Sequence, residues 1–168
     1  MFVKEIRDED FTSYKKPSMT IGFPNCSWKC GRGLCQNSSL AKAQSIYIDV
    51  DVLTKRYIDN PITHAVICAG LEPFDNFDDL LRLVAALRTY TTDDIVIYSG
   101  YTEYELENGW FYMENRNSNT RKMAYEFLKT YPNIIIKFGR FIPNQQPHYD
   151  EVLGVKLASY NQYARRIS

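Results

Sequence analysis

Short apolar runs alternate along the chain with longer amphipathic stretches, and this alternation is the strongest constraint on the fold. Four runs predict β-strands, at Ser18–Phe23, His64–Gly70, Asp94–Gly100 and Asn133–Phe138. Three stretches between them predict helices, at Asp51–Asp59, Asn76–Leu87 and Thr120–Tyr131. Strands that alternate with helices in this way are typical of an α/β protein with a largely parallel sheet.

The clearest helix follows Asn76, because apolar residues recur there at helical spacing from Phe77 to Leu87. Asn76 is the expected N-cap, with Asp79 reaching back to complete a capping box. The polar and aromatic segment Glu107–Asn119 shows no clear period and is predicted to be a loop. No element is predicted beyond Pro143.

Composition and charge limit the functions open to this chain. Its 168 residues suit one domain, 1–168, and 45% hydrophobic with 24% charged residues is typical of a globular protein. The charged start of the chain lacks the apolar core of a signal peptide, and no run approaches the roughly 20 apolar residues of a membrane span. We therefore expect a cytoplasmic protein without a membrane partner. Twenty basic residues balance twenty acidic ones, so no nucleic-acid partner is expected.

Three of the four cysteines, Cys26, Cys30 and Cys35, lie within one short loop after the first predicted strand. Cytoplasmic thiols stay reduced, so zinc or an iron–sulfur cluster explains the group better than disulfides do. Closed structural zinc needs four ligands, but Cys68 falls inside a predicted strand and neither histidine has a zinc spacing. A cubane cluster held by three cysteines leaves one iron open, and this fits the loop well. Unligated surface cysteines are the alternative.

Two further segments follow predicted strands directly, Ala69–Phe74 ("AGLEPF") and Tyr98–Gly100 ("YSG"). Gly70 allows a ligand to approach the backbone closely, and the residue before Pro73 is restricted to an extended or turn conformation. Each segment alone is more often an ordinary turn. Because ligands of α/β sheets bind beyond the carboxyl ends of the strands, we expect both segments to meet the cysteine loop at one edge of the sheet.

Together these motifs resemble the radical S-adenosylmethionine enzymes, and most closely the small activating proteins of anaerobic ribonucleotide reductase. The similar segments are the cysteine loop with Gln36-Asn37, then Gly70–Pro73 for the family's "GGEP", Ile97–Leu106, Lys137–Phe141 and Ser159–Arg166. They run in the family's order through most of the chain. Two departures stand out, since the second cysteine gap has four residues where the family has two, and Leu71 replaces a glycine. Gly31 and Gly33 are expected to let the longer loop fold.

The resemblance implies a fold, a set of ligands and two cofactors. The fold would be a partial (βα) barrel of radical S-adenosylmethionine type, since a full barrel takes about 250 residues. The cofactors would be a 4Fe-4S cluster and S-adenosylmethionine. The cluster would be held by Cys26, Cys30 and Cys35, and S-adenosylmethionine by Gly70, Leu71, Glu72, Pro73 and Ser99. No catalytic residue beyond these cofactor ligands is expected.

By the same resemblance, the reduced cluster would cleave S-adenosylmethionine, and the resulting radical would generate a glycyl radical on a partner. The expected partner is the large subunit of anaerobic ribonucleotide reductase or another glycyl-radical protein, and the expected electron donor is a small flavodoxin or ferredoxin. Two alternatives remain open at this point. The enzyme could act on another peptide or small molecule, or the chain could be a non-catalytic iron–sulfur or metal-binding module.

Overall fold

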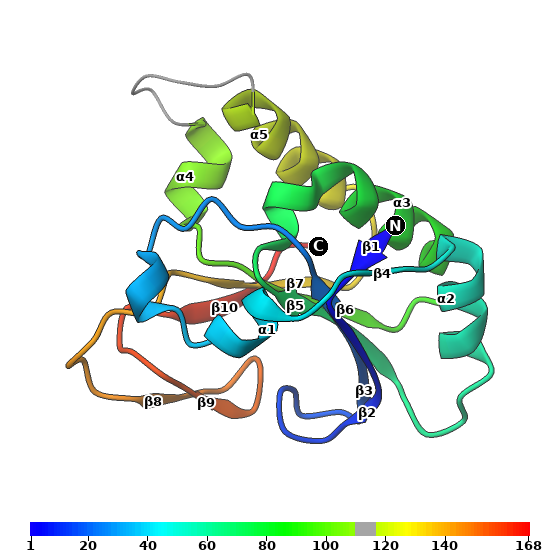
Figure 1. Cartoon of the computed structure of the whole chain (residues 1–168). Helices are drawn as coiled ribbons and strands as arrows, with labels where there is room; N and C mark the ends of the chain where they lie inside the picture. Colours follow the sequence, from blue (N-terminus) through cyan, green and yellow to red (C-terminus); the bar gives the residue numbers. More distant parts are fainter. Residues whose placement is uncertain (110–116) are drawn as a thin grey trace.

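A six-stranded sheet forms the centre of the computed structural model, which describes residues 1–109 and 117–168 (Figure 1). The strand order is β10-β7-β6-β5-β3-β2. The strands are β2 (Glu5–Asp10), β3 (Ser18–Phe23), β5 (Ala65–Gly70), β6 (Asp94–Tyr98), β7 (Ile134–Phe138) and β10 (Tyr163–Arg166). The four inner strands run parallel, and the edge strands β2 and β10 are antiparallel to their neighbours. The prediction of an α/β fold with a largely parallel sheet is therefore confirmed.

Helices cover one face of the sheet, and a hairpin lies against the other (Figure 1). The covering helices are α2 (Val50–Ile58), α3 (Phe77–Arg88) and α5 (Asn117–Leu128). The hairpin consists of β8 (His148–Asp150) and β9 (Val155–Leu157). The remaining elements are β1 (Phe2–Val3), β4 (Ile46–Tyr47), α1 (Ser38–Lys42), α4 (Glu103–Asn108) and the 3-10 turns η1 (Arg32–Leu34) and η2 (Pro73–Asn76). Within residues 1–109 and 117–168, no helix has the length and apolar character to cross a membrane.

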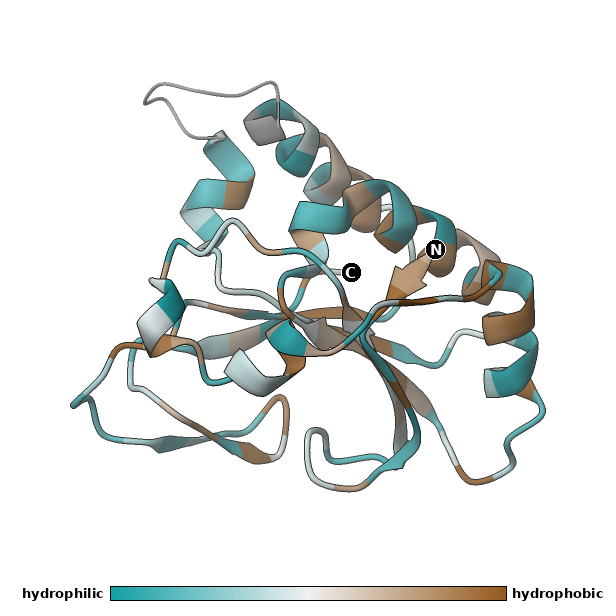
Figure 2. Cartoon of the chain, viewed as in Figure 1, coloured by the Kyte–Doolittle hydropathy of each residue, from teal (hydrophilic) through white to brown (hydrophobic). Residues whose placement is uncertain are grey.

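The side chains of the inner strands point alternately to the two faces, as the pleat of a β-strand requires. On β7, Ile134, Ile136 and Phe138 pack in the helix-side core, whereas Ile135 packs on the hairpin side. Because both faces are covered, these strands are apolar throughout instead of alternating with polar residues. Figure 2 shows this as largely hydrophobic central strands beneath helices whose outer surfaces are hydrophilic. Lys137 breaks the pattern, since it lies on the hairpin side within this apolar strand.

All four predicted strands and all three predicted helices are present, with ends shifted by a few residues. The edge strands and the β8–β9 hairpin were not predicted, because their short polar sequences carry no period. The predicted loop Glu107–Asn119 is wrong at both ends, since Glu107 and Asn108 close α4 and residues 117–119 open α5. Its central residues, 110–116, lie outside the described residues.

The predicted capping box of α3 is also wrong. Asn76 stands at the N-cap position but makes no capping bond, because its amide donates instead to the carbonyls of Glu72 (2.7 Å) and Asn25 (3.3 Å). Asp79 pairs with Arg82 rather than reaching back. The helix continues directly from η2, so its entry is fixed by that turn and by the contacts of Asn76.

Asp150 provides a test of how the hairpin is held. Its buried carboxylate accepts hydrogen bonds from the backbone N–H groups of Leu153 (2.9 Å) and Ala164 (2.8 Å). Asp150→Ala leaves two buried donors unpaired, so the free energy of unfolding should fall by about 2 to 4 kcal/mol. Urea unfolding measures this change. The exposed neighbour is the control, since Glu151→Ala should stay within about 0.5 kcal/mol of wild type. Equal effects in the two variants would contradict this role of Asp150.

Candidate functional site

A cavity of about 410 Å³ opens at the carboxyl ends of the parallel strands and extends along the hairpin side of the sheet. Such a volume suits a small-molecule ligand. Seven of the predicted site residues line it: Cys26, Cys30, Cys35, Gly70, Leu71, Glu72 and Ser99. Pro73 does not, because it is buried behind the wall as the first residue of η2. The predicted convergence of the cysteine loop with the two strand ends is confirmed.

The three loop cysteines are free and half-buried. The loop turns sharply after Cys26, where Trp28 (φ 58°) and Gly31 (φ 86°) have left-handed backbones and the Gly31 N–H donates to the Trp28 carbonyl. Burial raises the pKa of the Cys26 thiol to about 12, although the Trp28 N–H donates to its sulfur. Cys68, by contrast, is fully buried in the core, as predicted.

No three His, Cys, Asp or Glu side chains of the described residues lie close enough together to hold a single metal ion. Cys26, Cys30 and Cys35 are all among the residues that line the cavity. Asn37, which follows them, donates from its amide to the carbonyl of Gly70 (2.6 Å). The end of the cysteine loop is thereby tied to the end of β5.

The segment Gly70–Glu72, here called the strap, is joined by its backbone to the end of β3. The N–H of Leu71 donates to the Phe23 carbonyl (3.2 Å), and the N–H of Glu72 donates to the Asn25 carbonyl (3.0 Å). Gly70 has φ 91°, and a Cβ there would lie 2.6 Å from the Phe23 nitrogen. Both geometry and space therefore require glycine at position 70. Leu71 does not have a positive φ, so the loss of the second family glycine causes no backbone strain.

Glu72 is buried in the cavity wall and links β5 to β6. Its carboxylate accepts hydrogen bonds from the Ser99 hydroxyl (2.9 Å) and from the backbone N–H groups of Gly100 (2.8 Å) and Phe74 (3.2 Å). Burial raises the pKa of Glu72 to about 7, against the opposing effect of these three donors. No lysine or arginine of the described residues forms an ion pair with it.

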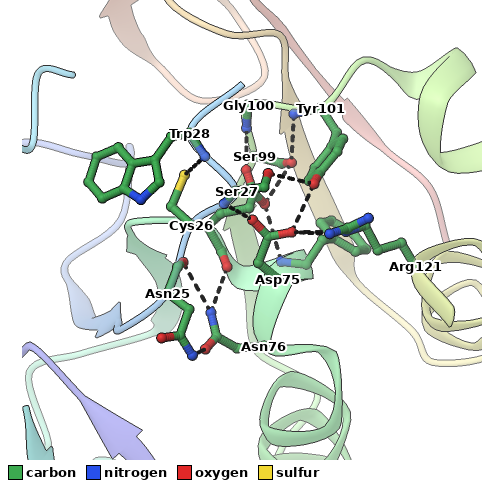
Figure 3. Close-up of polar contacts among 12 residues, drawn as sticks. Asn25, Cys26, Ser27, Trp28, Asp75, Asn76, Ser99, Gly100, Tyr101 and Arg121 are labelled. Atoms are coloured by element: carbon green, nitrogen blue, oxygen red, sulfur yellow. Dashed lines mark hydrogen bonds and ion pairs between the residues drawn. The ribbon is translucent and has the colours of Figure 1, made fainter. Parts of the chain in front are cut away.

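Asp75 is a second carboxylate that joins the elements around the cavity (Figure 3). It accepts hydrogen bonds from the Ser27 N–H, from the Tyr101 hydroxyl (2.8 Å) and from the Arg121 guanidinium (2.9 Å). These contacts connect the cysteine loop, the end of β6 and helix α5 through one side chain. No sequence pattern indicates this role, because Arg121 lies 46 residues away from Asp75.

Two basic side chains of the cavity were likewise not identified from the sequence. Lys137 is only 7% exposed, and its ammonium donates to the carbonyls of Gly139 (2.6 Å) and Ser99 (3.4 Å). Burial lowers the pKa of Lys137 to about 8. Arg140 instead pairs with both carboxylate oxygens of Glu105 (2.6 and 2.8 Å). Lys137 could have been found, since it is the one charge within the apolar run of β7.

Comparison with known proteins does not identify this site: no family model matches the chain, and no similar protein is found among curated proteins or solved structures. Its interpretation therefore rests on its own chemistry. One cavity wall combines three free thiols, the strap with its positive-φ glycine, and a buried carboxyl group. Soft thiolates suit iron or zinc, and backbone carbonyls suit an ammonium group.

The raised pKa of Glu72 predicts a pH dependence of stability. The group titrates near 4.5 in the unfolded chain and near 7 in the folded one, so the folded state holds the extra proton between these values. The free energy of unfolding should therefore fall as the pH rises from 5 to 8, by an amount on the order of 2 kcal/mol. The glutamine of Glu72→Gln does not titrate, so the free energy of unfolding of this variant should not show this decrease between pH 5 and 8.

Urea unfolding of the metal-free protein across this pH range measures the difference between wild type and Glu72→Gln. A constant offset between the two comes from altered hydrogen bonds and does not affect the slope. The exposed Glu151→Gln is the control and should follow the wild-type slope. Parallel curves for wild type and Glu72→Gln would contradict the assignment.

Proposed function

We propose that this chain is a radical S-adenosylmethionine enzyme that generates a glycyl radical on the large subunit of an anaerobic ribonucleotide reductase or on another glycyl-radical protein. One observation carries the proposal. Cys26, Cys30 and Cys35 share a single cavity with the strap and with Ser99, at the carboxyl ends of parallel strands. In this proposal the open sheet is the core of a partial (βα) barrel of the same type.

The donor set supports a cluster more than it supports a single ion. A closed site for one zinc ion takes four ligands, whereas the loop offers three thiols. A cubane cluster binds each thiolate through a different iron, so its cysteines stand farther apart. Three cysteines would then hold a 4Fe-4S cluster with one iron left for the amino and carboxylate groups of S-adenosylmethionine.

The strap supports a role in holding the amino group of that cofactor. The carbonyl of Gly70 already accepts from Asn37, and that of Glu72 accepts from Asn76. The Leu71 carbonyl accepts no hydrogen bond within the described part of the chain, and Leu71 lines the cavity. We therefore assign the Leu71 carbonyl as an acceptor for the ammonium group, with the buried Glu72 carboxyl close behind it.

The chain's part in the reaction is to bind, orient and keep out water. Cys26, Cys30 and Cys35 would hold the cluster, and the chemistry that the bound cluster would supply is one-electron reductive cleavage of S-adenosylmethionine, with hydrogen-atom removal from the substrate as its outcome. Ile67, Ala69 and Leu157 give the cavity an apolar floor that protects this chemistry from side reactions. Ser99 is oriented by its bond to Glu72.

The open sheet favours a macromolecular substrate. Strands β2 and β10 are the two edges of the sheet and do not pair with each other. A loop of a partner protein can enter on such an open side, whereas enzymes for small molecules more often enclose the substrate. Much of the cysteine loop is exposed, which would give a flavodoxin or ferredoxin access to it.

Cysteine variants test the proposed cluster and its chemistry. After anaerobic reconstitution and reduction by dithionite, the wild type should convert S-adenosylmethionine to methionine and 5′-deoxyadenosine. Cys26→Ala, Cys30→Ala and Cys35→Ala should each abolish this product and lower the bound iron, because three ligands are the minimum for the site. Chromatography of the products and iron analysis provide the measurements.

Cys68→Ala is the matched control, since Cys68 lies in the core away from the cavity and should retain iron and product formation. Full iron content in Cys35→Ala would contradict its place among the ligands. Mixing with a glycyl-radical protein then tests the substrate, because activation yields a glycyl doublet in its paramagnetic resonance spectrum. Cleavage of S-adenosylmethionine without this doublet would favour a different substrate.

A further inference from the structure

Lys137 is a buried lysine in the cavity wall, and no carboxylate of the described residues accepts a hydrogen bond from it. Lys137 is the penultimate residue of β7 and lies on the cavity side of the sheet, opposite to Ile136 and Phe138 on the helix side. Its ammonium donates only to the carbonyls of Gly139 and Ser99 among the described residues. No aspartate or glutamate in this part of the chain forms an ion pair with it.

A buried cation is costly unless an anion compensates it. Glu72 lines the same cavity and its negative charge favours the charged form of Lys137, but three donors already hold that group, and its raised pKa keeps it partly protonated near neutral pH. The counter-charge of Lys137 must therefore come largely from what the cavity and the cysteine loop hold.

We propose that Lys137 is the buried counter-charge of the iron–sulfur cluster and that it raises the cluster's reduction potential. This inference rests on the proposed function. A cubane cluster held by three thiolates is anionic. Reduction by one electron from an external low-potential flavin or iron–sulfur protein would add one negative charge, and no bond would form or break. A fixed positive charge in a site of low dielectric favours the reduced state over the oxidised one.

The other basic residues that line the cavity are less able to act in this way. Lys156 is exposed on β9, where solvent and salt screen its charge. Arg140 is neutralised by Glu105 through two short contacts. Lys29 and Arg7 are also exposed, and Arg7 forms ion pairs with Glu5 and Asp10. Lys137 is thus the buried cation of this wall, and its effect on a nearby electron is screened least.

The test is a redox titration of the cluster-loaded protein with titanium(III) citrate, without S-adenosylmethionine and followed by paramagnetic resonance. Lys137→Gln keeps a donor for Gly139 but removes the charge, so its midpoint potential should be lower than that of wild type. Lys137→Arg keeps the charge and should stay near wild type. Lys156→Gln removes an exposed charge from the same cavity and should not change the midpoint.

A midpoint of Lys137→Gln equal to that of wild type, or a fall no larger than that of Lys156→Gln, would overturn the inference and leave the proposed function intact. A wild type that assembles no cluster would overturn both. If Lys137→Gln binds no cluster, iron analysis measures the cluster content of each variant and circular dichroism shows whether the variant is folded. If Lys137→Arg loads while Lys137→Gln and Lys137→Met remain folded but empty, the cluster needs the charge and the inference is supported. If Lys137→Arg fails as well, it is overturned.

Discussion

Gly70 approaches the end of β3 so closely that any side chain there would meet the backbone of Phe23. This contact lets the strap turn across the top of β3 and brings its N–H groups onto the carbonyls of Phe23 and Asn25. The cysteine loop starts at that point, so its origin is fixed by the strap. Asn37 then ties the end of the loop to the Gly70 carbonyl. The thiols, the strap and the strand ends share one cavity because of this single close approach.

Two buried carboxyl groups extend the constraint to the neighbouring elements. Glu72 accepts from the end of β6, and Asp75 accepts from the cysteine loop, from Tyr101 and from Arg121 of α5. Neither group gives the site much stability through charge alone, since buried acids are costly. What they provide is position, because each holds backbone or side-chain donors of several elements at fixed distances. Preorganisation of this kind is what a reactive cofactor requires from its protein.

Much of this arrangement could be predicted from the sequence. The inner strands of the sheet are apolar, and the helices carry apolar residues at regular spacing, so both were identified. The meeting of Cys30, Glu72 and Ser99 followed from parallel strands, whose carboxyl ends lie at one edge. The edge strands and the capping of α3 were missed or wrong because they depend on partners distant in sequence. Asn76 illustrates this, since Asn25 and Glu72 compete successfully for its amide.

The charged side chains that face the cavity could not be predicted from sequence patterns either, because their positions also depend on partners distant in sequence. Lys137 is a cation in an apolar strand. Its role depends on which face of the sheet its side chain lies on and on what binds in the cavity at that face. The fold explains its burial but gives it no carboxylate hydrogen-bond partner among the described residues, whereas an iron–sulfur cluster would supply an anion. The proposed roles of the three cysteines and of Lys137 thus both depend on a bound iron–sulfur cluster.

Electron paramagnetic resonance of the anaerobically reconstituted and reduced protein, with and without S-adenosylmethionine, tests this account most directly. The account predicts the signal of a reduced cubane cluster and a change of that signal when S-adenosylmethionine is added, because the cofactor binds the open iron. A properly reconstituted sample without such a signal, or with a signal that S-adenosylmethionine leaves unchanged, would contradict it.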